Sequence, residues 1–131
     1  MIGPNIAAWI FGVLLAGLAL FQLALAAGAP WGSLAMGGRY PGRFPPPMRI
    51  AALVQIAIYV LMAIVVFVRA GLLLPDLFEP SRIAVWAVVS LSAVAVVLNL
   101  ITPSKWERRL WAPVAILMFA TSLRVALAGQ A

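Results

Sequence analysis

Four long apolar runs, separated by polar or Gly/Pro-rich segments, make up most of this 131-residue chain. The runs cover residues 6–27, 50–68, 83–101 and 110–128. Each is long enough to cross a hydrocarbon core of about 30 Å, which takes about 20 helical residues. The apolar positions are continuous rather than alternating, and lipid does not tolerate unpaired backbone groups, so the runs predict helices. We therefore expect an all-α membrane protein, a four-transmembrane-helix bundle that forms a single domain over residues 1–131.

The connections between the apolar runs differ in chemistry. Residues 28–48 hold five Gly and five Pro, and because Gly costs about 1 kcal/mol and Pro about 3 kcal/mol inside a helix, this segment is expected to be an irregular interfacial loop. In the third connection, residues 102–109, Ser104 is followed three residues later by Glu107. This capping-box pattern predicts that the last helix begins near Ser104.

Basic residues predict the orientation of the bundle, because cytoplasmic loops are enriched in Lys and Arg. The first and third connections lie on one side and hold six of them, all candidates for contact with lipid headgroups: Arg39, Arg43, Arg49, Lys105, Arg108 and Arg109. The opposite side has only Arg69, Arg82 and Arg124. This bias places the first and third connections in the cytoplasm and both termini outside. No Lys or Arg precedes the first run, so we expect a retained helix rather than a cleaved signal peptide.

Composition supports the membrane class and excludes several functions. Hydrophobic residues make up 66% of the chain and charged residues 9%, whereas soluble domains carry about 25% charged residues. The absence of Cys and His removes thiol chemistry, the commonest metal ligand and the usual proton-transfer side chain. The net charge of +6 is spread over helix ends, which predicts no nucleic-acid partner. We expect no metal, no cofactor and no catalytic residues.

Polar side chains within the apolar runs are the main candidates for function, because each is costly in lipid unless it finds a partner. Gln22, Gln55 and Asn99 are expected at similar depth in the cytoplasmic half, and Tyr59 and Ser92 share faces with them at helical spacing. These five residues predict a polar layer joining three helices. The layer could act as interhelical hydrogen-bonding glue, at about 0.6 to 2 kcal/mol per amide, or as a ligand site.

Arg124 is the only charge inside the last apolar run. We expect its guanidinium at the outer boundary, paired with Asp76 or Glu79, the two acids of the second connection. Arg124, Asp76 and Glu79 thus form a predicted outer charge cluster.

Small residues recur every four positions from Ala8 to Gly28, at Ala8, Gly12, Ala16, Ala24 and Gly28, with only Leu20 interrupting the stripe. Such a stripe allows close helix approach, which predicts packing against a neighbouring helix or a second subunit.

The segments PWGSLAMGGRYPGRFPPPMR and TPSKWERRLWAPVAILM look like those of small uncharacterised bacterial integral membrane proteins with four transmembrane spans. The resemblance implies only the topology and a multi-pass location in the bacterial inner (plasma) membrane.

Two functions agree with these observations. The first is a non-enzymatic accessory or assembly subunit that packs against membrane lipids or partner membrane proteins. The alternative is a transporter of a small or lipid-like molecule, acting as a monomer or as a homodimer.

Overall fold

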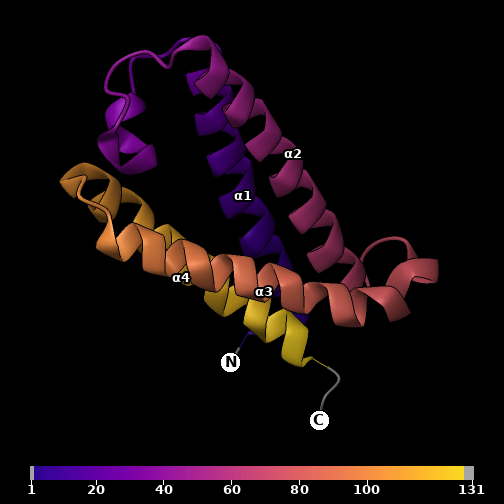
Figure 1. The fold of residues 1–131 in the computed structure, drawn as a ribbon. Helices are drawn as coiled ribbons and strands as arrows, with labels where there is room; N and C mark the ends of the chain where they lie inside the picture. Colours follow the sequence, from indigo (N-terminus) through magenta and orange to yellow (C-terminus); the bar gives the residue numbers. More distant parts are fainter. Residues whose placement is uncertain (1, 129–131) are drawn as a thin grey trace.

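Four long helices form the chain in a computed structural model that describes residues 2–128 (Figure 1). They are α1 (Pro4–Ala26), α2 (Pro46–Arg69), α3 (Phe78–Ile101) and α4 (Lys105–Leu127). Three short 3-10 turns lie between them: η1 (Gly32–Leu34), η2 (Met36–Gly38) and η3 (Pro75–Leu77). Within the described residues all four long helices are long and apolar enough to cross a membrane, which confirms the predicted fold class.

The helices begin two to five residues before the predicted apolar runs. Pro46 and Pro47 lie in the first turn of α2, where the missing N–H of proline would be unpaired in any case. Hydropathy detects only the apolar part of such a helix, so it misses the polar first turn. At α4 the predicted start is confirmed, because the hydroxyl of Ser104 accepts a hydrogen bond from the Glu107 amide at 3.2 Å.

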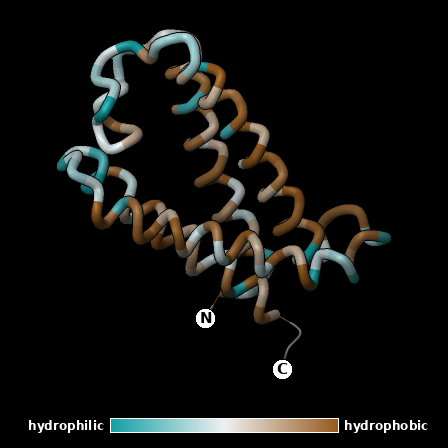
Figure 2. Tube along the Cα trace, viewed as in Figure 1, coloured by the Kyte–Doolittle hydropathy of each residue, from teal (hydrophilic) through white to brown (hydrophobic). Residues whose placement is uncertain are grey.

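The helices pack as two antiparallel hairpins, α1 with α2 and α3 with α4, which lie together at the end that holds both described termini and diverge toward the opposite end (Figure 1). The main core lies at the closed end, where buried residues of all four helices include Phe11, Val66, Val85 and Val125. At the diverging end the segment between α1 and α2, residues 27–45, reaches the turn between α3 and α4 (Figure 1). We call this segment the roof loop. Hydrophilic residues gather there and at the helix connections, while the helices are mostly hydrophobic (Figure 2).

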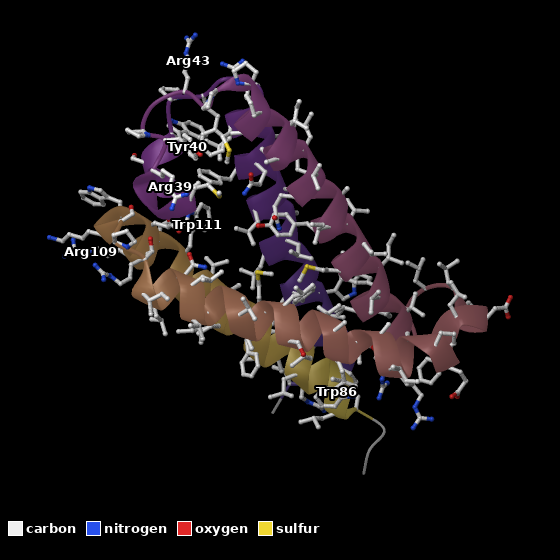
Figure 3. The ribbon with its side chains drawn as sticks, viewed as in Figure 1. Arg39, Tyr40, Arg43, Trp86, Arg109 and Trp111 are labelled. Carbon is white, nitrogen blue, oxygen red and sulfur yellow. The ribbon has the colours of Figure 1, made fainter. Side chains whose placement is uncertain are left out.

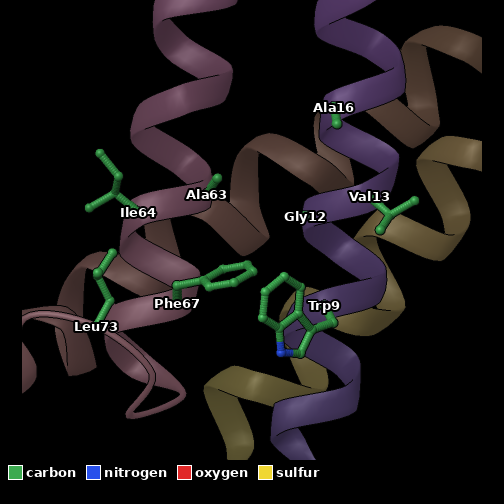
Figure 4. Close-up of a pocket in the computed structure, with 8 residues that line it drawn as sticks. All are labelled: Trp9, Gly12, Val13, Ala16, Ala63, Ile64, Phe67 and Leu73. Atoms are coloured by element: carbon green, nitrogen blue, oxygen red, sulfur yellow. The ribbon is translucent and has the colours of Figure 1, made fainter.

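The small-residue stripe of α1 packs only in part as predicted. Ala8 is fully buried, and a Cβ added to Gly12 would lie 2.9 Å from the Phe67 ring of α2. These two positions confirm packing within the chain. Ala16 is exposed, however, and lies beside a shallow apolar hollow of about 400 Å³ between α1 and α2, next to Trp9 and Phe67 (Figure 4).

Candidate functional site

A cavity of about 810 Å³ lies between the two hairpins at the roof-loop end. All four helices and the roof loop contribute to its walls. Its volume falls within the range of about 300 to 1,000 Å³ that is typical of ligand pockets. The cavity exists because the hairpins diverge here, whereas the apolar core joins them at the other end (Figure 1).

The walls are mostly apolar, with a few polar side chains at middle depth. All five side chains of the predicted polar layer line the cavity: Gln22, Gln55, Tyr59, Ser92 and Asn99. The Tyr59 hydroxyl lies close to the amides of Gln22 and Gln55, so it links α1 to α2. An apolar pocket with a few converging polar groups is the usual form of a small-molecule site.

The other two polar residues do not act as interhelical glue. The Asn99 amide donates to the Ala95 carbonyl of its own helix at 2.7 Å. Ser92 is only 1% exposed, and its hydroxyl oxygen has no hydrogen-bond partner. Within the described residues no hydrogen bond therefore joins α3 to the rest of the layer, because the hairpins diverge at this end.

The roof loop is attached to the start of α4 by two hydrogen bonds that cross the molecule. The Gly37 amide donates to Oε2 of Glu107 at 2.9 Å, and the Ser104 hydroxyl donates to the Ser33 carbonyl at 2.8 Å. Glu107 thus turns away from the Ser104 amide, its expected capping-box partner, which donates instead to Thr102 Oγ1 at 3.3 Å. These contacts cover one end of the cavity.

Aromatic side chains close the side of the cavity between α1 and α4. The Trp111 indole lies beneath the roof loop and donates to the Leu34 carbonyl at 2.9 Å (Figure 3). The centroid of its ring lies 4.8 Å from the ring centroid of Phe21. The Phe21 ring in turn stacks on Trp31, with 6.4 Å between the ring centroids. This contact joins the hairpins and leaves little room for passage on that side.

The opposite side, between α2 and α3, is apolar and carries the more exposed wall residues. The wall residues of α1 and α4 are all buried or half-buried. Several wall residues of α2 and α3, in contrast, are exposed on the outside of the bundle. The large exposed ones are Ile58, Leu91, Leu98 and Ile101. Because α2 and α3 are long and apolar enough to span a membrane, this exposed side would face hydrocarbon rather than water.

Within the roof loop, Gly32 allows two segments of the loop to come into contact. Its amide donates to the Gly42 carbonyl at 2.8 Å, and a Cβ at this position would overlap the Tyr40 carbonyl oxygen. The loop is therefore folded back on itself, which sequence analysis described only as irregular.

The predicted headgroup-contacting residues separate into two groups. Five of them are exposed at the roof-loop end: Arg39, Arg43, Lys105, Arg108 and Arg109. Arg43 and Arg109 extend away from the molecule (Figure 3). Arg49 is half-buried instead, and its Nε donates to the Phe44 carbonyl at 2.8 Å, so it fixes the end of the roof loop.

The expected ion pair of Arg124 is not formed. Its Nε donates to the Ile2 carbonyl at 3.0 Å, and within residues 2–128 the only ion pair joins Arg82 to Glu79 at 3.6 Å. The prediction was wrong because Arg82, three residues from Glu79 on the same helix, takes that carboxylate, while Asp76 remains exposed in the loop.

Sequence analysis also missed the buried charge at the closed end. Arg69 is 4% exposed, and its Nη2 donates to the carbonyls of Ala126 and Ala128 at the end of α4. Its guanidinium lies 5.4 Å from the Phe78 ring centroid. A lone Arg directly after an apolar run was the only sequence signal for this contact. The fold alone shows that the C-terminal end of α4 lies within reach of Arg69.

The other missed site residue is Glu107, which the sequence analysis considered only for helix capping and which the structure places in the cavity wall. Comparison with protein-family models, with curated proteins and with solved structures finds no match for this chain, so the candidate site rests on its own geometry.

Proposed function

We propose that this protein is a multi-pass protein of the bacterial inner membrane, with both termini outside the cytoplasm, that binds an amphipathic, lipid-like molecule in the cavity between its hairpins. The observation that carries the binding role is the cavity of about 810 Å³, whose largely apolar wall holds a few polar side chains, among them Gln22, Gln55 and Tyr59. The bias of basic residues and the resemblance to bacterial four-span proteins support the location.

The polar side chains of the wall give a bound ligand groups with which to form hydrogen bonds. A buried polar group without a partner costs about 1 to 3 kcal/mol, and polar groups inside membrane proteins commonly mark ligand or substrate paths. The exposed apolar side between α2 and α3 gives a hydrophobic molecule access from the bilayer. Apolar walls with a few hydrogen-bonding groups favour a ligand with a hydrocarbon part and a polar head.

The role we propose is binding or transport rather than catalysis. The sequence contains no His and no Cys, and the cavity offers amides, hydroxyls and one carboxylate. These groups can orient and release a ligand. They do not form a paired acid and base or an activated nucleophile.

A second candidate is an accessory subunit that packs against another membrane protein. The apolar hollow beside Gly12, Ala16 and Phe67 favours it, because small residues there would let a partner helix approach closely (Figure 4). A stoichiometric protein that co-purifies in mild detergent would support this function.

Quenching of Trp111 fluorescence tests the binding role. In a variant whose other four Trp residues are replaced by Phe, Trp111 in the cavity wall reports a nearby bromine atom. Traces of a dibrominated fatty alcohol, added to phosphatidylcholine nanodiscs, should quench Trp111 saturably. A variant that keeps only Trp86, at the opposite end and outside the cavity (Figure 3), should show quenching that rises linearly with probe.

Ser92→Leu provides the first testable prediction. The substitution places a larger side chain in the cavity wall, so the apparent affinity for the fatty alcohol should fall by about five- to 150-fold, equivalent to about 1 to 3 kcal/mol. Ser90→Leu is the matched control, because Ser90 is exposed on the same helix and should change affinity by less than about twofold. Equal quenching curves for both variants and the parent, or linear quenching throughout, would refute the binding role.

A further inference from the structure

The charge of the cavity wall points to a ligand class. Glu107 is the only charged side chain among the described wall residues, and it lies at the roof-loop end. At the deep end the wall is apolar and includes Met62, Leu91 and Met118. The cavity is therefore polarised along its length, with a carboxylate at one end and hydrocarbon at the other.

The Glu107 carboxylate has only neutral partners. Oε2 accepts from the Gly37 amide at 2.9 Å, and the Thr102 side chain lies close to it. Among residues 2–128 no Lys or Arg nitrogen lies within 4.0 Å of this carboxylate, although three basic residues share its turn of α4. Glu107 also lies in the first turn of α4, where the helix dipole stabilises a negative charge, and a carboxylate in a cavity wall attracts a cationic group.

The exposed basic residues at this end do not reverse the preference. Lys105, Arg108 and Arg109 are exposed to solvent, whose high dielectric constant weakens their effect on a group inside the cavity. Arg109 also extends away from the molecule (Figure 3) and lies over the Trp106 ring at 6.0 Å. A group inside the cavity contacts the carboxylate directly, in surroundings of lower dielectric constant, so the local charge dominates.

We propose that the cavity selects an amphipath with a cationic head, which passes between α2 and α3 from the bilayer, places its head beside Glu107 and lays its chain against Met62 and Met118. This inference rests on the proposed binding function and adds the charge of the ligand. Gln22 and Gln55 offer hydrogen bonds between the two ends, so a head that also carries a donor fits the wall best.

Competition between three detergents with the same chain tests the charge preference. In the Trp111-only protein loaded with the dibrominated fatty alcohol, dodecyltrimethylammonium, dodecyl maltoside and dodecyl sulfate are each titrated in phosphatidylcholine nanodiscs. The cationic detergent should restore Trp111 fluorescence at a mole fraction at least about tenfold below that of the sulfate, equivalent to about 1.4 kcal/mol. Equal potency of the three, or stronger displacement by the sulfate, would overturn the proposed ligand class.

Glu107→Gln tests the residue itself, and this is the second prediction. The amide oxygen can still accept from the Gly37 amide, so the roof loop should stay attached while the charge is lost. The cationic and anionic detergents should then differ by less than about threefold. Glu79→Gln is the matched control, because Glu79 lies at the closed end outside the cavity and should leave the preference unchanged. A preference that survives Glu107→Gln would also reject the inference; should this variant fail to fold, the competition in the parent protein remains decisive.

The passage between α2 and α3 is tested by two neighbouring residues of α3. Leu98 lines the cavity and is 57% exposed, whereas Val97 is 55% exposed and does not line it. Leu98→Trp should therefore slow the onset of quenching after probe addition, whereas Val97→Trp should not. Stopped flow measures the onset. The reporter at position 111 is then 5-hydroxytryptophan, so that its fluorescence is distinguished from that of the added Trp. Equal onset rates in both variants would reject passage between α2 and α3.

These outcomes separate the two proposals. Linear, non-saturable quenching in every protein refutes the binding function as a whole, whereas saturable quenching without charge preference refutes only the cationic ligand. Mass spectrometry of molecules bound to the purified protein distinguishes the source of the cation. Enrichment of an amine-headed membrane lipid over the bulk membrane identifies an endogenous ligand, and a cavity that binds only added quaternary amines identifies an exogenous one.

Discussion

Arg69 shows how one side chain links two helix ends in this molecule. The guanidinium donates to two carbonyls at the end of α4, where helix carbonyls lack partners within the helix. A cation at a helix C-terminus also interacts favourably with the helix dipole. The buried Nε atom of Arg69 has no hydrogen-bond partner, and this offsets part of the stabilisation that the two hydrogen bonds give to the end of α4.

Replacing Arg69 by Met should therefore destabilise the protein locally, which is the third prediction. Hydrogen bonds from a charged donor contribute about 1.5 to 3 kcal/mol, so the free energy of unfolding should fall by about that amount. Hydrogen exchange should rise in the last turn of α4 above all. Unfolding in mild detergent and exchange measured by mass spectrometry would provide both quantities.

The matched control for this prediction is Arg82→Met. Arg82 makes an exposed ion pair with Glu79 at 3.6 Å, and such pairs contribute about 0 to 1 kcal/mol. If Arg82→Met destabilises the protein as much as Arg69→Met does, the helix-capping role of Arg69 is wrong.

At the scale of elements, the roof loop is the segment whose structure was least accessible from sequence. Its Gly and Pro content predicted an irregular path, and that is confirmed, but the two 3-10 turns and the contact between Gly32 and Gly42 were not foreseen. Gly and Pro residues indicate where a chain can bend. They do not indicate which distant carbonyl or carboxylate group the bent chain will contact.

Gly32→Ala is the fourth prediction, and it tests this folded-back loop. The added methyl group would overlap the Tyr40 carbonyl oxygen, which is backbone and cannot rotate away. Overpacking of this kind typically costs about 1 to 3 kcal/mol, so we expect a lower melting temperature and faster proteolysis of the roof loop. Limited proteolysis in detergent would report the loop directly.

Gly17→Ala is the control for that variant. No atom lies within 4 Å of a Cβ added at Gly17, which is exposed in the middle of α1. Since Ala is favoured over Gly inside a helix by about 0.5 to 1 kcal/mol, stability should be unchanged or slightly higher. A Gly32→Ala protein as stable as Gly17→Ala would contradict the close approach of the two chain segments.

On the scale of the whole molecule, the uneven packing of the hairpins creates the site. Small and branched side chains of all four helices interlock at the closed end, for instance around Ala7, Val66 and Val125. At the other end a second, smaller cluster joins Leu25, Phe44 and Ala52 within the α1–α2 hairpin and the roof loop alone. The space between the hairpins is therefore left to the cavity.

The fifth prediction concerns the orientation of the bundle in the membrane. Single cysteines can be introduced into this cysteine-free chain at Ser33, in the roof loop, and at Asp76, in the connection between α2 and α3. Both positions are exposed at opposite ends of the helices. In intact cells an impermeant thiol reagent should label the cysteine at position 76 and not the one at position 33, because the basic residues favour a cytoplasmic roof loop. The reverse pattern would invert the orientation, and equal labelling at both would contradict the hairpin arrangement.

The amino-acid sequence alone was enough to predict the four helices, their alternating direction, the N-cap of α4 at Ser104 and the five polar residues within the apolar runs. Hydropathy and helix capping act between residues close in the chain, so they can be read along it. Only the tertiary structure decided that these polar residues surround a cavity, that Arg124 contacts Ile2 rather than an acid, and that Glu107 meets Gly37 across 70 positions. Such contacts depend on how far apart the hairpins stand, which is set by side-chain packing at the other end of the bundle.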